Sequence, residues 1–424
     1  MPLPQGAVVT SSDEPDANWS GEAGNGELTG PQRVDARAAR QPAHLAKFHA
    51  PEVVFGPGSL AELGHCALRV GGRRPFLVTD PGLIEAGWVE EAVDYLRLAG
   101  LRPVVWHDVT PNPKDHEVEA GFQRYAESGS DVIIALGGGS CIDAAKGVAI
   151  LASNGGRILD FEGVDQVAAP IPPTVMVPST SGTGADVSQF AVVTDTAGQV
   201  KITIISRTLV PEISVIDPRL LTTMPDWLNA ATGLDALTHA IESFVSRAHN
   251  PLTDNLALHA VKLITGHLVG TQTRPKEVSP RLAMAQGSLE AGMAFTNAIL
   301  GATHAMSHQV GGLLDAPHGV VNGVLLPHVI RFNAQIQPGR FVALADAAGI
   351  ATDGVAPDEV ALMLAERVRA LADDVGVPRG LASLGVTEAD VPRLSRTTLK
   401  DACLATNPRD AGLLDIETLF RAAL

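Results

Sequence analysis

Short apolar runs alternate with amphipathic stretches between about residues 50 and 220. The apolar runs 75–79, 103–108, 131–136 and 174–178 predict strands, and helical periods cover 90–99 and 115–128. Since strands that alternate with helices are joined by right-handed crossovers, we expect a mostly parallel sheet with helices on both faces. A further β-rich pair, 189–195 and 200–206, is separated by a short turn and predicts a hairpin.

After about residue 220 the helical period dominates, over 227–245, 252–268, 280–297, 303–314 and further stretches to the C-terminus. This change predicts an α/β N-terminal Rossmann-like nucleotide-binding domain, residues 45–220, and an all-α C-terminal domain, residues 221–424. A ligand site is expected in the cleft between the two domains. Residues 1–44 are rich in Gly, Ser, Pro and charged residues, and they predict a disordered N-terminal tail.

Charge and cysteine content exclude several classes of protein. The formal net charge of −16 argues against a nucleic-acid partner, because phosphate binding needs a basic face. The three cysteines are far apart, so neither a disulfide framework nor a thiolate zinc site is expected. The chain lacks an apolar run of the roughly 18 residues that a membrane span needs, and its start lacks the features of a signal peptide. We therefore expect a cytoplasmic protein without a membrane partner.

A glycine turn follows the third predicted strand, in the segment that reads Leu-Gly-Gly-Gly-Ser-Cys-Ile-Asp from residue 136 to 143. Gly137, Gly138 and Gly139 have no side chains, so backbone amides there can approach a pyrophosphate closely. Ser140 and Asp143 have the spacing of a capping box, which predicts a helix N-terminus directly after the glycines. A glycine turn that serves only strand–helix packing is the alternative.

Two further segments favour a dinucleotide. Asp80 ends the first predicted strand, where a carboxylate can accept hydrogen bonds from a ribose and repel a 2′-phosphate. The alternative is a turn-forming aspartate before Pro81 and Gly82. The segment 179–184, Ser-Thr-Ser-Gly-Thr-Gly, follows another apolar strand and offers hydroxyls and amides to a cofactor, although it could also be an ordinary polar loop.

A second cluster suits a divalent cation. Asp235 and His239 are four residues apart on a predicted helix, and so are His304 and His308, which His318 follows closely. Residues with this spacing lie on one face of a helix, one turn apart. A carboxylate with several imidazoles suits Fe²⁺ or Zn²⁺ rather than Ca²⁺ or Mg²⁺. Spacing alone leaves open which three of these five residues complete the site.

Over about residues 50 to 424 these motifs resemble the iron-containing (group III) alcohol dehydrogenases. Segment 301–328 is similar to the family signature, and segment 401–409, Asp-Ala-Cys-Leu-Ala-Thr-Asn-Pro-Arg, matches a recurrent family segment. The resemblance implies metal ligation by Asp235, His239, His304 and His318, and it places the catalytic His308 beside the nicotinamide and the substrate. Implied cofactor contacts are Asp80, Asn112, the 138–140 turn, Thr180, Thr183, Ser188 and Lys201.

The resemblance also implies the dehydroquinate synthase-like fold and a metal-dependent, NAD-linked alcohol dehydrogenase or aldehyde reductase. Such an enzyme transfers hydride between a metal-bound primary alcohol and nicotinamide, using Fe²⁺ or alternatively Zn²⁺, and it is expected to be a homodimer or a higher homo-oligomer. We expect Phe161, Phe190, Met306 and Leu313 to line the substrate pocket.

Two other readings compete with this one. A polyol-phosphate dehydrogenase or a dehydroquinate synthase-like cyclase would need basic residues for its substrate, and residues 301–328 contain no Lys or Arg. An NAD(H)-binding regulatory or sensor protein on the same fold would have little turnover.

Overall fold

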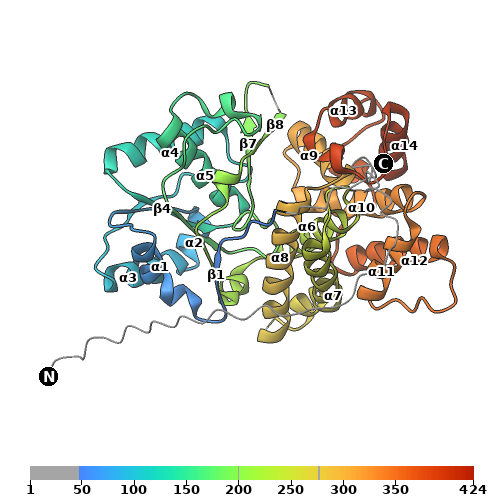
Figure 1. The fold of residues 1–424 in the computed structure, drawn as a ribbon, viewed down its shortest axis with the longest axis horizontal. Coiled ribbons are helices and arrows are strands. Elements are labelled where there is room, and N and C mark those ends of the chain that lie inside the picture. The colour runs from blue at the N-terminus through green and yellow to red at the C-terminus, as the bar shows by residue number, and fades with distance from the viewer. Residues whose placement is uncertain (1–46, 199, 276) are drawn as a thin grey trace, which may run out of the picture. The chain divides into compact units, whose positions relative to one another are not determined.

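The computed structural model describes residues 47–198, 200–275 and 277–424, so the predicted tail 1–44 lies outside the described residues. Lys47–Leu424 form one compact unit. Its first part is built on a six-stranded parallel sheet with the strand order β1-β9-β6-β4-β2-β3. Figure 1 labels β1 and β4 of this sheet. The strands are β1 (Glu52–Phe55), β2 (Pro75–Val78), β3 (Val104–Trp106), β4 (Val132–Gly137), β6 (Thr174–Pro178) and β9 (Ile213–Ile216).

Strands β2, β3, β4 and β6 confirm the four strands that the apolar runs predict, whereas β1 and β9 had not been predicted. These two strands have four residues each and pair with one another, Glu52 with Ile213 and Phe55 with Ile216. Their pairing joins segments far apart in the sequence.

Both faces of the parallel sheet are covered by helices, as expected. In β4, Ile134 and Leu136 pack into one core with α1 (Leu63–Arg69) and α3 (Trp88–Leu98). The alternate residues Ile133 and Ala135 pack into the opposite core with α4 (Asp115–Ser128) and α5 (Gly139–Asn154). A strand that is buried on both faces reads as a continuous apolar run, which is why β4 was easy to predict.

The predicted hairpin is also present. Strand β7 (Phe190–Asp195) pairs antiparallel with β8 (Val200–Ile205), and the short β5 (Gly163–Val164) joins the other side of β8. The amide of Thr194 in β7 donates to the carbonyl of Pro113. This small sheet therefore holds the segment that precedes α4 and carries Lys201.

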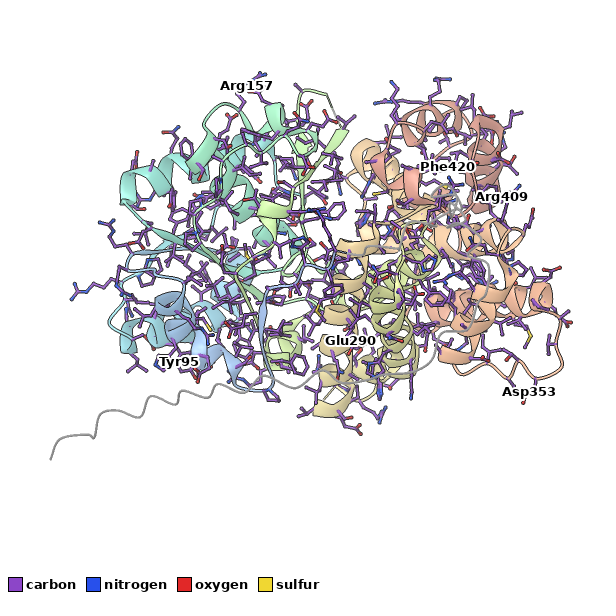
Figure 2. All side chains as sticks on the ribbon, in the orientation of Figure 1. Tyr95, Arg157, Glu290, Asp353, Arg409 and Phe420 are labelled. Carbon is purple, nitrogen blue, oxygen red and sulfur yellow. The ribbon has the colours of Figure 1, made fainter. Side chains whose placement is uncertain are left out.

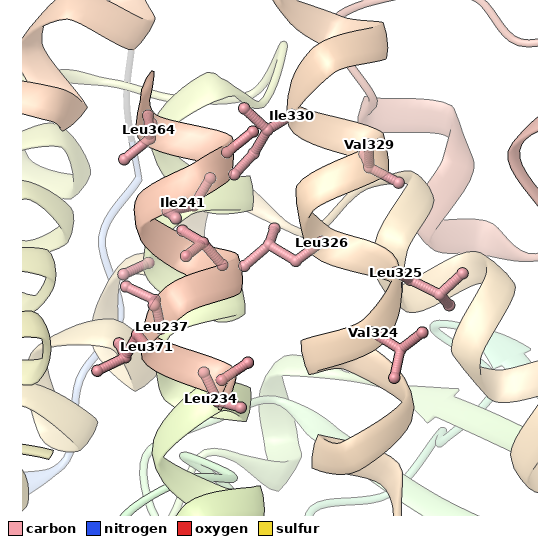
Figure 3. Packing of buried hydrophobic residues seen from close by; sticks show 14 of the residues in the cluster. Leu234, Leu237, Ile241, Val324, Leu325, Leu326, Val329, Ile330, Leu364 and Leu371 are labelled. Atoms are coloured by element: carbon pink, nitrogen blue, oxygen red, sulfur yellow. The ribbon is translucent and has the colours of Figure 1, made fainter. Parts of the chain in front are cut away.

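The second part of the chain is helical, with α6 (Asp226–Val245), α7 (Pro251–Thr273), α8 (Val278–Ala298), α9 (Ala302–Leu314), α10 (His318–Ala334), α11 (Pro338–Ala347), α12 (Pro357–Asp374), α13 (Val391–Thr398) and α14 (Leu413–Ala423). Leucine and isoleucine side chains of α6, α10 and α12 form the centre of its core (Figure 3). No helix in the described ranges is long and apolar enough to cross a membrane.

Helix α6 has an unusual environment, because every residue from Asn229 to Val245 is buried. A helix that is buried all round cannot leave polar side chains to water. Asp235, His239 and Glu242 on this helix must therefore find partners inside the protein.

Candidate active site

A cleft of about 740 Å³ is lined by residues that follow β2, β4 and β6 and by residues of α6, α9 and α10. Ligands of open α/β sheets bind at such carboxyl ends of parallel strands. All the predicted site residues line this cleft except Gly137, which ends β4. A Cβ atom at Gly137 would collide with the side chain of Cys141, so its missing side chain serves packing.

Helix α5 starts directly after the glycine turn, as predicted, but the predicted capping box is wrong. The N-cap is Gly138, and no side chain caps the N-terminus of α5. Ser140 lies inside the first turn, where its Oγ accepts a hydrogen bond from the amide of Asn112 at 3.1 Å. A Cβ atom at Gly139 would lie 2.8 Å from the Thr183 side chain, so the close approach of the two loops needs glycine there. The amides at the start of α5 are thus left uncapped for an anion.

Behind the turn, Lys146 of α5 is completely buried and had not been singled out from the sequence. Its Nζ donates to the carbonyl oxygens of Ala185 and Ser188 at 2.7 Å and of Phe190 at 2.9 Å. Burial lowers the pKa of Lys146 to about 8 and raises that of the neighbouring Asp143 to about 7. The lysine therefore fixes the loop that leads from Thr183 to β7.

Asp80 has the turn-forming role that was considered for it. It is the N-cap of α2 (Pro81–Glu85), where its Oδ1 accepts from the amide of Leu83 at 3.1 Å. Its Oδ2 accepts from the thiol of Cys141 at 3.3 Å. The carboxylate still lines the cleft, beside the start of α5.

A chain of hydrogen bonds crosses the cleft from the small sheet to the helical part. Lys201 Nζ donates to Asn112 Oδ1 at 2.7 Å, and Asn112 Nδ2 donates to Asp315 Oδ1 at 2.5 Å. Asn112 and Asp315 both have left-handed backbones, with φ of 54° and 50°. Burial lowers the pKa of Lys201 to about 8. Asp315 was not predicted, because only the fold brings it to Asn112.

The predicted metal ligands gather around Asp235. Asp235 Oδ1 lies 3.9 Å from His239 Nε2, 3.6 Å from His304 Nε2 and 3.7 Å from His318 Nε2. These side chains come from α6, α9 and the first residue of α10. The sequence spacing places only His239 beside Asp235 on one helix. The packing of α9 and α10 against α6 brings His304 and His318 to the same place.

The second nitrogen of each histidine has its own partner. His304 Nδ1 lies 2.7 Å from Glu242 Oε2, His239 Nδ1 lies 3.1 Å from the Gly182 carbonyl, and His318 Nδ1 lies 3.3 Å from Ser307 Oγ. Such contacts fix the ring so that Nε2 faces a metal ion. Ligand atoms of Asp235, His239 and His304 lie within 4.8 Å of one another, and His318 Nε2 lies 3.7 Å from Asp235. A carboxylate with imidazole nitrogens in this arrangement fits a divalent cation of the Fe²⁺ or Zn²⁺ type.

The protonation of this cluster follows from its burial and its carboxylates. Burial alone would raise the pKa of Asp235, but the three histidines outweigh it and hold that pKa far below its usual range. Burial lowers the pKa of His239 to about 4. For His304 burial is outweighed by hydrogen bonds with Asp235 and Glu242, which raise its pKa to about 9. Of these histidines, His304 is therefore the one whose protonated form its carboxylate partners favour.

Glu242 is a site residue that the sequence analysis missed. Besides His304 Nδ1 it accepts from the amides of Gly301 at 3.0 Å and Thr303 at 2.6 Å, at the start of α9. A signal was present, since Asp235, His239 and Glu242 recur at i, i+4 and i+7 on one face of an apolar helix.

His308 has different neighbours from the four converging residues. Its Nδ1 lies 2.8 Å from Asp401 Oδ2, and its ring stacks on that of His318 with centroids 5.3 Å apart. Asp401 and Cys403 come from the C-terminal segment that the sequence analysis noted as a family match. No local pattern pointed to a contact between that segment and α9.

The expected substrate-pocket lining is largely corrected. Phe190 lines the cleft, together with Phe295, Leu300 and Cys403. Met306 instead belongs to the helical core, because it lies on the side of α9 away from His304 and His308. Phe161 and Leu313 pack against the hydrophobic cores and do not line the cleft.

Comparison with known proteins agrees with this geometry. Residues 50–218 match the family model "Iron-containing alcohol dehydrogenase", and residues 229–424 match "Fe-containing alcohol dehydrogenase family, C-terminal". The chain is 41% identical to the 1,3-propanediol dehydrogenase of Citrobacter freundii over 371 residues, which are 87% of this chain and 96% of that one.

Two further relatives extend the likeness. The NAD-dependent methanol dehydrogenase of Bacillus methanolicus is 37% identical over 380 residues, 89% of this chain and 99% of that one. A crystal structure of a 1,3-propanediol oxidoreductase superposes with a TM-score of 0.87 at 39% identity, covering 90% of this chain and all of that one (100%).

Proposed function

Because the chain belongs to the iron-containing alcohol dehydrogenase family, we propose that Asp235, His239, His304 and His318 hold its metal ion and that His308 acts in catalysis. The protein is a metal-dependent, NAD-linked alcohol dehydrogenase or aldehyde reductase that uses Fe²⁺. Its substrates are small alcohols and aldehydes. Zn²⁺ is the alternative metal, since it accepts the same ligands.

The roles of the chain's own residues follow from their positions. Bound in the cleft, the ion supplies Lewis acidity toward the alcohol oxygen, and the nicotinamide supplies the hydride acceptor. The uncapped start of α5 and the Thr180–Thr183 loop would hold the pyrophosphate, and Asp80 the adenosine ribose. His308 would take the alcohol proton at Nε2 and pass it to solvent. Phe190, Phe295 and Leu300 would exclude water from the reacting carbon.

One observation carries this proposal. The oxygen of Asp235 and the three imidazole nitrogens lie in the same cleft as the uncapped glycine turn. A metal and a dinucleotide bound there would therefore meet in this cleft. Their neighbourhood is the arrangement that hydride transfer from an alcohol needs.

The test is anaerobic reconstitution with Fe²⁺ or Zn²⁺, followed by NADH formation at 340 nm with primary alcohols and diols. We expect metal-dependent turnover with NAD, little with NADP, and loss of both metal and turnover in His304→Ala. His259→Ala is the matched control, because His259 pairs with Glu290 at 2.6 Å outside the cleft. Retention of metal and turnover in His304→Ala would overturn the ligand assignment.

An NAD(H)-binding sensor with little turnover is not favoured, because all four converging ligands are intact. We also propose that residues 45–220 bind the dinucleotide and that residues 221–424 bind the metal and the substrate.

The protein is further proposed to be a homodimer, which light scattering after size-exclusion chromatography tests. A cytoplasmic location is proposed on the cysteines, which are free and buried.

A further inference from the structure

Asp401 is held rigidly at the back of His308. Its Oδ2 lies 2.8 Å from His308 Nδ1 and 3.3 Å from Gln309 Nε2, and its Oδ1 accepts from the amide of Cys403 at 2.9 Å. Both members of the pair are nearly buried, with side-chain exposures of 9% for His308 and 11% for Asp401. His308 lines the cleft and Asp401 does not. The carboxylate therefore reaches the reaction only through the histidine.

The segment that carries Asp401 is anchored to the start of α9. Thr406 Oγ1 donates to the carbonyl of Leu300 at 2.7 Å, and Asn407 Oδ1 accepts from the amide of Ala302 at 3.1 Å. Further along, the Arg409 guanidinium, labelled in Figure 2, lies 3.8 Å from the centre of the Phe332 ring of α10. These contacts fix the distance between Asp401 and the helix that presents His308.

The ring of His308 is restrained from two sides. Asp401 Oδ2 accepts a hydrogen bond from His308 Nδ1. The ring of His318 stacks on the face of the His308 ring with an interplanar angle of 15°. An ionised carboxylate at Nδ1 selects the tautomer that carries its hydrogen there, which leaves the lone pair on Nε2. Among the described residues Nε2 has no hydrogen-bond partner, so it is free to meet a ligand of the cleft.

We propose that Asp401 is a positioning residue for the reaction, which fixes the tautomer and the ring plane of His308 so that Nε2 faces the substrate. The inference rests on the proposed role of His308. It also gives the segment 401–409 a function, because the segment delivers this carboxylate to α9.

The experiment is a double-mutant cycle on the metal-loaded enzyme, with Asp401→Ala, His308→Ala and the double variant. We expect Asp401→Ala to lower kcat about 10- to 100-fold, as loss of such orienting partners does, with little change in the KM of the alcohol. In the His308→Ala background, adding Asp401→Ala should lower kcat by less than about twofold. A merely structural carboxylate would give losses that multiply in the double variant, which would overturn the proposal.

Two further variants keep the test decisive. Asp401→Asn keeps the shape of the side chain and replaces the alanine variant if that variant fails to fold. We expect Asp401→Asn to lower kcat, while metal content and the NADH affinity measured by fluorescence stay near wild type. Asp410→Asn is the control, because Asp410 directly follows the segment 401–409 but is exposed and pairs with Arg247 at 2.6 Å. If Asp401→Asn kept full kcat, the inference would fail. Absence of turnover in the wild type would instead overturn the proposed function.

Discussion

At the residue scale, we expect the Asp80 carboxylate to combine a structural role with selection of the cofactor. Its Oδ1 caps α2 through the amide of Leu83, while the same group lines the cleft. Asparagine caps helices as well as aspartate does, so Asp80→Asn removes the charge and keeps the cap. We expect the preference for NAD over NADP to fall about tenfold or more, because the repulsion of a 2′-phosphate is lost.

The ratio of kcat/KM for the two cofactors measures this change, with thermal unfolding as the check on the cap. An unchanged ratio in a normally folded Asp80→Asn protein would show that another residue selects NAD.

His304 carries a second prediction at this scale. Burial lowers its pKa, but hydrogen bonds with Asp235 and Glu242 outweigh burial and raise the pKa to about 9 in the metal-free protein. A metal ligand must be neutral, so metal uptake near pH 7 should release a proton. The apparent metal affinity should then weaken by about tenfold for each pH unit of acidification below the pKa.

Proton release on addition of Zn²⁺, followed with an indicator dye in weak buffer, tests this directly. Uptake without a released proton would mean that the His304 ring is already neutral.

At the scale of elements, the metal site depends on how closely α10 approaches α6. A Cβ atom at Gly319 would collide with the carbonyl oxygen of Ala231 and lie 3.2 Å from Asp235 Cβ. Gly319→Ala should therefore push the neighbouring His318 away from Asp235. We expect a loss of stability of about 1–3 kcal/mol from overpacking, together with weaker metal retention.

Gly266→Ala in α7 is the matched control. A Cβ there would meet nothing within 4 Å, so the change should be neutral or stabilise by up to about 1 kcal/mol. Metal content and chemical denaturation of both variants measure the difference. Normal metal retention in Gly319→Ala would show that the helices can separate without moving the ligands.

The regular elements were largely predictable for a local reason. Strand β4 is a continuous apolar run because both of its faces are buried, and α4 shows its amphipathic period clearly. The capping box at Ser140 failed because Gly138, with extended backbone, already serves as N-cap. The strands β1 and β9 were missed, although they are no shorter than β2, and they pair with one another across the chain.

At the scale of the whole molecule, the chain Lys201–Asn112–Asp315 ties the small sheet to the helical part across the cleft. A cofactor in the cleft should be retained by this link. Asp315→Ala removes the acceptor and the residue's preference for the left-handed backbone. We therefore expect NADH to dissociate about tenfold faster, with a raised KM for NAD and an unchanged KM for the alcohol.

Stopped-flow fluorescence of NADH release gives the rate. Asp315→Asn retains an acceptor and tolerates the left-handed backbone, so its rate should fall between those of the wild type and Asp315→Ala. Equal rates in all three proteins would show that the link does not retain the cofactor.

The sequence by itself determined the α/β and helical parts, the glycine turn and the candidate residues on α6 and α9. Periodicity and short spacings are local properties, and local geometry turns them directly into faces of a helix or a strand. Only the tertiary structure brought His304 and His318 to Asp235 and placed Asp401 behind His308 and Asp315 beside Asn112. Those contacts arise from helix packing between distant segments, and local spacing contains no information about them.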